Sequence, residues 1–560
     1  MATVTRPAVL DEAHVGDIRG ALGTIRVGDT AARPTLSGKL KTLLAIVGPG
    51  LIVMVGDNDA GAFATYGQAG QNYGTRLLWT LLLLIPVLYV NQEMVLRLGA
   101  VTGVGHARLI LQRFGRFWGM FEIIDLFLLN TLTIITEFIG ITLAAGYLGV
   151  PKILAVLFAA AVIIATAFTG SFRTFERVAI VLCAGSLLLI PLFVLAHPSG
   201  SQMARGFTTF SLPGGGGGMA AVMLLVIGIV GTTVAPWQLF FQQSYVIDKR
   251  ITPRFIRYEK ADLWIGIAVV VVGAAALMGT AAAAAAHTSA TGNFTDSAGL
   301  AHAVAAYSGR VSGVLFAIAL LDASIIGAFA VSLSSAYAIG DVLGMKHSLH
   351  RGVGQAKGFY ALYAALICAA AAIVLLPGSP LGLITEGVQV LAGVLLPSAT
   401  VFLLLLCNDR AVLGPWVNGR GTNVFATAVV TALITLSVVL TASVVFPTIT
   451  AGQNFAIVAA CVTLAAGAGL AMLAARWLGH RRRLAGHDET AATPKALAEA
   501  IAEDAAEVAD KMTWRMPPLD ELPAPVITGA RKIGLIALRG YLAIALIMVV
   551  VKVVETALGH

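Results

Sequence analysis

Residues 48–65 read GPGLIVMVGDNDAGAFAT. The apolar residues are those of a buried helix, but two carboxylates and an amide, Asp57, Asn58 and Asp59, stand between glycines in the middle of the run. If the run crosses a membrane, each carboxylate near its centre costs about 2.5–3.5 kcal/mol on insertion scales. We therefore predict that the helix is interrupted here and that these side chains face a cavity, an ion or one another.

The composition places this run in a membrane. Of the 560 residues, 58% are apolar and 12% are charged, against roughly 25% charged residues in soluble domains. The mean hydropathy is +0.87. Apolar runs of about 20 residues recur along the chain, whereas outer-membrane strands alternate over only about 10 residues. The composition excludes an ordinary soluble enzyme and predicts an all-α, polytopic membrane protein.

The apolar runs predict about twelve helices within a transporter domain at 43–478. The expected spans lie near 43–71, 75–97, 118–147, 153–171, 174–196, 219–247, 260–286, 312–342, 358–376, 381–407, 424–446 and 453–477. Residues 1–42 are expected to form a cytoplasmic tail and 479–531 a cytoplasmic linker. The apolar segment 532–560 contains Arg539 and either spans the membrane or lies at its interface.

Positive charge predicts the orientation of the bundle. With the N-terminus inside, the inner segments carry 26 Lys and Arg residues and the outer loops carry four. This asymmetry places the N-terminus and the end of the twelfth span in the cytoplasm, in what we expect to be a bacterial plasma membrane. The net charge of +8 arises from these loops, so we expect the lipid bilayer and no nucleic acid as a partner. The sequence does not indicate the oligomeric state.

The sixth span carries a second interruption. Residues 231–236 read GTTVAP, and Pro236 removes a backbone donor and clashes with the preceding turn. Four spans separate the two interruptions, so they fall at equivalent places in blocks at about 43–196 and 219–407. That spacing predicts two inverted five-helix repeats with discontinuous first and sixth helices, which hold a substrate near the middle of the membrane.

At these residues the chain resembles the NRAMP family of divalent-metal transporters. Residues 48–51 and 59–65 resemble the family's first helix, whose motif is Asp-Pro-Gly-Asn followed by an aromatic residue, Ala and Thr. The resemblance continues through RLGAVTG at 97–103 and EFIG at 137–140. It implies a divalent metal cation as the cargo, moved by alternating access, and no cofactor.

The departures from the family pattern concern the ion ligands. The family aspartate is kept as Asp59, but Ala62 replaces its asparagine and Ala235 replaces its methionine. The two histidines of the sixth helix are Trp237 and Gln242 here. A thioether favours transition metals, whereas Mg²⁺ prefers oxygen and keeps its waters. With these replacements the chain resembles the NRAMP-related magnesium transporters. That branch implies partly hydrated Mg²⁺ as cargo, with Mn²⁺ also accepted.

The same resemblance implies transport without protons. The Thr-Asp pair that the family uses in proton movement falls on Thr133 and Ile134, although Glu137 is kept nearby. All ten histidines lie in tails, in loops or at the ends of spans. We therefore expect uptake driven by the membrane potential rather than by a proton gradient.

The expected ion site is centred on Asp59. Asp57 and Asn58 either coordinate through water or cap the second half-helix. By resemblance, Gly56 and Thr232 offer carbonyl oxygens, Ala62 and Ala235 line the site, and Gln389 either reaches the ion or makes a structural hydrogen bond. Three residues are candidates behind the direct ligands: Asp322, Glu137 and Gln238. Asp322 is either an acid that attracts cations or a carboxyl kept protonated by burial.

Three other functions compete with a magnesium importer. A proton-coupled Mn²⁺/Fe²⁺ carrier of the NRAMP type is disfavoured by Ala235 and the missing histidines. An intramembrane aspartyl hydrolase would need Asp59 and Asp322 as an acid–base pair. An organic-solute carrier on the same scaffold fits the clustered acids poorly, because they match a cation better than a carboxylate.

Overall fold

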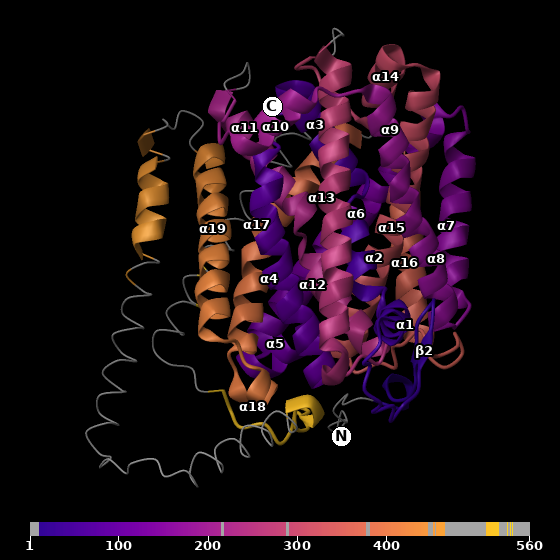
Figure 1. Ribbon diagram of the computed structural model, residues 1–560, viewed down its shortest axis with the longest axis vertical. Coiled ribbons are helices and arrows are strands. Elements are labelled where there is room, and N and C mark those ends of the chain that lie inside the picture. Colours follow the sequence, from indigo (N-terminus) through magenta and orange to yellow (C-terminus); the bar gives the residue numbers. More distant parts are fainter. Residues whose placement is uncertain are drawn as a thin grey trace.

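The computed structural model describes residues 11–213, 218–286, 291–376 and 381–445, with shorter pieces between 452 and 540. Within these residues, nine helices are long and apolar enough to cross a membrane, and one bent pair, α1 (Leu36–Ile46) with α2 (Pro49–Val55), makes ten. The helices stand side by side as one bundle (Figure 1). The predicted all-α, polytopic fold is confirmed.

The helices of the bundle follow the predicted spans closely. They are α3 (Ala60–Tyr73), α4 (Trp79–Thr102), α6 (Arg116–Tyr147), α7 (Lys152–Phe168), α8 (Phe172–Gly185), α9 (Leu189–Ala196), α11 (Gly218–Thr233), α12 (Pro236–Asp248), α13 (Ile256–Ala286), α15 (Arg310–Val342), α16 (Lys357–Val374), α17 (Leu381–Cys407) and α19 (Arg420–Val445). The predicted twelfth span and the segments 479–531 and 532–560 lie largely outside the described residues.

Short elements cover the two ends of the bundle. At the lower end in Figure 1 lie β1 (Ile18–Arg19), β2 (Thr24–Ile25), α5 (His106–Phe114) and α18 (Arg410–Leu413), and at the upper end lie α10 (Gly200–Thr208) and α14 (Ser297–Ser308). The described residues also form four 3₁₀ turns, η1 (Glu12–His14), η2 (Ser186–Leu188), η3 (Pro253–Phe255) and η4 (Gly414–Trp416), and a short apolar helix at Phe455–Leu464.

Both predicted interruptions are present. The first span divides into α2, which ends at Gly56, and α3, which begins after Asp59. The sixth span divides into α11 and α12, and Pro236 is the first residue of α12. Proline suits that position because its fixed φ matches the first helical turn and its missing N–H is not needed there.

The interrupted spans pack against each other's blocks. The half-helix α3 packs on α13 of the second block, and α12 packs on α4 of the first block. Near the centre, α6 packs along α15. In both cases the half-helix of one block packs on the second helix of the other block, as expected for two related blocks. The inverted repeat itself stays a prediction.

A buried ion pair fastens the lower end. Lys249 Nζ lies 2.6 Å from Glu176 Oε1, with both side chains fully buried, and also donates to the Val47 carbonyl at 2.8 Å. The other carboxylate oxygen of Glu176 accepts the Ala21 N–H at 2.5 Å. Because breaking a buried pair leaves an uncompensated charge at a cost of about 3–5 kcal/mol, this contact fixes the start of the first span, α8 and the N-terminal segment together.

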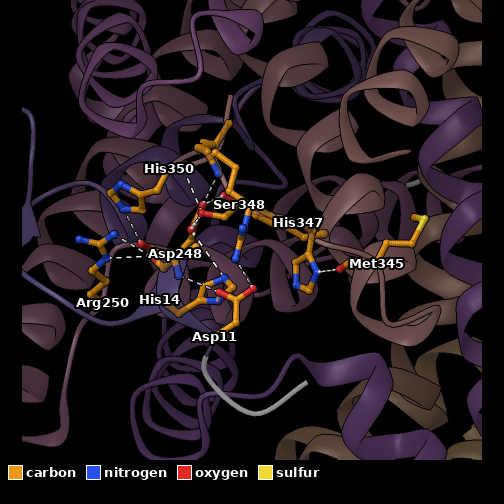
Figure 2. Close-up of polar contacts among 12 residues, drawn as sticks. Asp11, His14, Asp248, Arg250, Met345, His347, Ser348 and His350 are labelled. Carbon is orange, nitrogen blue, oxygen red and sulfur yellow. Dashed lines mark hydrogen bonds and ion pairs between the residues drawn. The ribbon is translucent and has the colours of Figure 1, made fainter. Parts of the chain in front are cut away.

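The N-terminal segment from residue 11 onward is folded onto the lower end of the bundle. Arg250, which follows α12, donates two hydrogen bonds to the Ala13 carbonyl, at 2.9 and 2.7 Å. His14 Nδ1 lies 2.9 Å from Asp11 and its Nε2 lies 3.8 Å from Asp248 (Figure 2). From residue 11 the predicted tail is therefore a strap across the bundle. No periodic pattern in the sequence indicates it.

Asp248 is the anchor of this strap. Its carboxylate accepts hydrogen bonds from Ser348 Oγ at 2.5 Å and from the Leu349 N–H at 2.9 Å, both in the loop between α15 and α16. His350 Nε2 lies 3.0 Å from the Asp248 carbonyl, as Figure 2 shows. One carboxylate therefore joins the strap, the end of α12 and this loop.

The strap is expected to loosen as the pH rises. Burial of the His14 ring lowers its pKa, but the neighbouring carboxylates of Asp11 and Asp248 outweigh burial, and the net pKa is raised above 6.5. Because the folded-state pKa is raised, the stabilisation is complete below about pH 6.5 and is lost as the pH rises through the raised pKa. We expect trypsin to cut at Arg19 and Arg26 faster at high pH, by at most about tenfold per pH unit.

The measurement is the cleavage rate of the full chain between about pH 6 and pH 9, divided at each pH by the rate for His14→Ala. The variant lacks the titrating ring, so the ratio removes the pH dependence of trypsin itself. A ratio that does not change with pH would show that His14 does not hold the strap.

Candidate metal-binding site

The two helix interruptions face each other in the core of the bundle. Tyr66 on α3 and Thr233 at the end of α11 share a hydrogen bond of 2.7 Å between their hydroxyls. A Cβ placed on Gly56 would lie 3.2 Å from the Trp237 ring of α12. The unwound segments of the first and sixth spans therefore form one region, and α17 lies alongside it.

The N-terminus of α3 is closed by two carboxylates. Asp59 Oδ1 accepts the Ala62 N–H at 2.8 Å, and Glu137 Oε2 from α6 accepts the Ala60 N–H at 3.1 Å. Asp59 and Glu137 also interact with each other. The predicted capping role of Asp57 or Asn58 is wrong, because Asp59 occupies the N-cap position and its side chain is the one that reaches the free N–H groups.

The interruptions release backbone carbonyl oxygens into this region. In a continuous helix the Gly56 carbonyl would accept the Ala60 N–H, but that N–H is donated to Glu137. The Thr232 carbonyl would accept from residue 236, where proline has no N–H. Both carbonyls predicted as ion ligands therefore lack their helical donors, which is the condition for binding a cation.

Buried polar side chains in the same region lack partners. Within the described part of the chain, neither oxygen of Asp57, nor Thr232 Oγ1, nor Gln389 Nε2 has a hydrogen-bond partner. Their exposed fractions are 0%, 2% and 4%. A buried carboxylate without a partner is expensive, which makes Asp57 a candidate for contact with a cation or its waters.

Gln389 approaches this region closely. A Cβ placed on Gly61 would lie 1.9 Å from Gln389 Nε2 and 3.1 Å from Asp59 Oδ1. Only glycine at position 61 leaves room for the amide beside the aspartate. The atom that approaches is the amide nitrogen, which donates hydrogen bonds and does not bind cations, so the role of Gln389 as an ion ligand stays a prediction.

The remaining predicted residues divide between this region and its surroundings. Ala62 and Ala235 are buried here and offer no side-chain donor. Gln238 lies on α12, where it donates to the Thr233 carbonyl at 3.3 Å and accepts from Gln92 at 2.9 Å. Gln238 therefore connects the candidate site to the buried polar groups of α4.

Asn58 and Asp322 do not join the others. A Cβ placed on Gly273 of α13 would lie 2.3 Å from Asn58 Nδ2, so the amide is directed toward α13. Asn58 and Asp322 both line a separate small cavity between the first span, η2 and α15. The side chains of Asn58 and Asp59, which are neighbours in the sequence, therefore point into different regions.

Buried amides on α4 and α12 were not predicted from the sequence. Gln92 on α4 donates to Gln238 at 2.9 Å, and Asn91 on α4 and Gln242 on α12 are also buried. The available signal was the spacing of Gln238 and Gln242, because residues four apart share one face of a helix.

The donor set suits a cation that passes through. Among the described residues, no group of three or more His, Cys, Asp or Glu side chains could hold a metal ion. The candidate site instead offers Asp57 and Asp59 together with amide, hydroxyl and carbonyl oxygens. Donors of this kind match the oxygen ligands that hard cations prefer.

Comparisons with known proteins agree with this fold. A family model described as natural resistance-associated macrophage protein-like, Nramp, matches residues 50–443. The divalent metal cation transporter MntH of Burkholderia ambifaria is 31% identical over 317 residues, which are 53% of this chain and 68% of that protein. MntH of Pectobacterium carotovorum is 26% identical over 431 residues, 74% of this chain and 98% of that protein.

A solved structure shows the same architecture. A point variant of the Eremococcus coleocola manganese transporter aligns with a TM-score of 0.62 and 22% identity, over 81% of this chain and 99% of that chain. The match of the family model covers most of this chain and includes both interrupted helices. On this evidence the protein belongs to the Nramp family.

Proposed function

We propose that this protein imports divalent metal cations, Mg²⁺ above all and Mn²⁺ in addition, by alternating access and without proton coupling. The family supports divalent cations as the cargo class, since its relatives are named divalent metal cation transporters. The preference for Mg²⁺ rests on the donor atoms of the candidate site.

The observation that carries the proposal is a site of oxygen donors without sulfur. Asp57 and Asp59 supply carboxylates, Thr232 and Gln389 supply neutral polar groups, and all four are buried. The family's methionine position holds Ala235, so no thioether stands there to favour a transition metal. Mg²⁺ takes hard oxygen ligands and keeps several waters, and alanine side chains occupy less of the site than asparagine and methionine would.

Burial of the site supports alternating access. Asp59 is 3% exposed, so an ion can enter or leave only when the surrounding helices move. The interrupted spans supply the moving parts, because half-helices can tilt without breaking a continuous ladder of hydrogen bonds.

The membrane potential is a sufficient driving force. A potential of 100 mV supplies about 2.3 kcal/mol per charge, hence about 4.6 kcal/mol for a divalent ion. Ile134, where the family has an aspartate, is buried beside Thr133 and offers no titratable group. Uptake of Mg²⁺ therefore needs no accompanying proton.

A proton-coupled Mn²⁺ carrier is the second candidate. Glu137 lies next to Asp59 in the core, and a carboxyl in that place can carry a proton. The solved relative is named a manganese transporter. The hydrolase alternative loses support, because Asp59 faces Glu137 while Asp322 lines a different cavity.

Asp59→Asn is expected to reduce Mg²⁺ flux into proteoliposomes by about 100-fold or more. An amide oxygen can still cap α3, so the fold is kept while the negative charge that faces the ion is lost. Removing a group that only supports a metal ligand costs about 10–100-fold in affinity, and a direct ligand is worth at least as much. Flux is measured with a fluorescent Mg²⁺ indicator inside the vesicles.

The matched control is Asp296→Asn. Asp296 caps α14 at the upper end by accepting the Gly299 N–H at 2.8 Å, so the same substitution there changes a helix cap outside the site. Near-normal flux in the Asp59 variant would remove Asp59 from the ion path.

Mg²⁺ influx is expected to proceed without proton uptake. The reason is the replacement of titratable family residues by Ile134, Trp237 and Gln242. The measurement follows internal pH and internal Mg²⁺ together at a fixed membrane potential, with Mn²⁺ in a parallel experiment. Stoichiometric acidification with either ion would favour the proton-coupled carrier for that ion.

The double variant Ala62→Asn, Ala235→Met is expected to shift the preference from Mg²⁺ toward Mn²⁺ and Cd²⁺. The methionine restores a soft donor, and the asparagine narrows the site and displaces waters that Mg²⁺ holds tightly. Isothermal titration should show about tenfold or more tighter Mn²⁺ or Cd²⁺ binding. Each single variant serves as a control, and unchanged affinities with full Mg²⁺ flux would show that these alanines do not set the preference.

A further inference from the structure

A second polar site lies beside the metal site. A small cavity of about 10 Å³ is bounded by Val55 and Phe63 of the first span, η2 and α9 of the fifth, and α15 of the eighth. A volume of that order holds about one water-sized sphere. Two polar side chains in its wall, Asn58 and Asp322, have no role in the metal site described above.

Asn58 is the first indication of a ligand. It is 2% exposed, and neither polar atom of its amide has a hydrogen-bond partner within the described residues. An amide buried in this way loses the hydrogen bonds it would have with water. An occupant of the cavity would restore them.

Asp322 supplies charge to the same cavity. A Cβ placed on Gly185 of α8 would lie only 2.0 Å from Asp322 Oδ2, so the carboxylate is held against the point where the fifth span tightens into η2. The described residues form no ion pair with Asp322 within 4.0 Å. Asp322 is partly buried, and a charged side chain within a membrane-spanning helix usually pairs with another charged or polar group.

The chemistry of the wall selects the kind of occupant. The oxygen donors are the Asp322 carboxylate, the Asn58 amide oxygen and Ser186 Oγ, whose hydrogen is donated to the Cys183 carbonyl at 2.7 Å. One negative charge balances one positive charge. A cavity of this size has no room for the waters that Mg²⁺ retains, whereas a dehydrated Na⁺ fits.

We propose that Asp322, Asn58 and Ser186 form a sodium site next to the interruption of the first span. Asn58 lies between Asp57 and Asp59 in the unwound segment, so an ion held on its side chain also fixes the backbone of both aspartates. Na⁺ binding therefore holds the two aspartates of the divalent site in position. This inference goes beyond the proposed metal transport and is tested without any divalent metal.

The test measures the thermal stability of the full chain in detergent and its binding of ²²Na⁺. Replacing choline chloride by NaCl at constant ionic strength should raise the Tm by about 2 °C or more, since a ligand that binds only the folded state stabilises it. Asp322→Asn should abolish this rise and weaken ²²Na⁺ binding about tenfold or more. Asn58→Ala should reduce both the rise in Tm and the binding of ²²Na⁺. It replaces Asp322→Asn as the test variant if the latter does not fold.

Two control variants separate this site from others. Glu386→Gln changes a carboxyl on α17 that accepts a hydrogen bond from Gln68 at 3.1 Å, and it should keep the full Na⁺ effect. Asp59→Asn should also keep it, which makes loss of metal transport and loss of Na⁺ binding distinguishable.

Three outcomes would overturn the proposal. The first is a wild-type Tm that does not respond to Na⁺, and the second is a Na⁺ response that survives in both the Asp322 and the Asn58 variants. The third is stabilisation by low pH in sodium-free buffer that Asp322→Asn removes while NaCl has no effect, because the carboxyl then binds a proton.

Discussion

Breaking a helix inside a membrane frees N–H and C=O groups that water cannot reach, and every such group needs a partner. At the start of α3 the free N–H groups are taken by two carboxylates, Asp59 from the same chain segment and Glu137 from α6. The carbonyls of Gly56 and Thr232 have no helical donor in exchange. One residue, Asp59, therefore closes the half-helix and stands at the candidate ion site. In the proposed site, an ion on the Asp59 carboxylate would share it with the cap of α3, which would connect cargo binding to the position of a half-helix.

Small residues make this arrangement possible. Gly61 leaves the space that the Gln389 amide fills, and a Cβ on Gly231 would lie 2.1 Å from the Gln389 carbonyl oxygen. The backbone of α17 thus approaches the sixth span closely, and the Gln389 side chain of α17 approaches the first span. Close backbone contact of this kind is how helices associate in lipid, where apolar side chains gain little by leaving the bilayer. The interruption and the packing around it depend on the same glycines.

The sequence predicted the places of both interruptions because glycine, proline and charge have strong local effects on a helix. It also predicted that Asp57, Asp59, Thr232 and Gln389 come together, through a family resemblance and not through periodicity. It did not predict the direction of Asn58, since side chains in an unwound segment follow no helical period and are oriented by packing against distant residues such as Gly273. The strap of residues 11–33 was missed for a similar reason. Its contacts with Glu176 and Arg250 join positions more than 150 residues apart.

The strap and the metal site are connected through the first span. The N-terminus of α2 is capped from α13, where the Asp262 carboxylate accepts the N–H groups of Gly48 and Gly50 at 3.1 and 2.7 Å. Lys249, next to Asp248, bonds the carbonyl of Val47 immediately before α2. The lower half of the first span is thus fixed at its end by α13 and by the segment that anchors the strap. Opening the site toward the lower end requires α2 to leave these partners or to carry them along. In the proposed transport cycle, the Asp262 and Glu176–Lys249 contacts are the bonds that would have to break or move for this end to open.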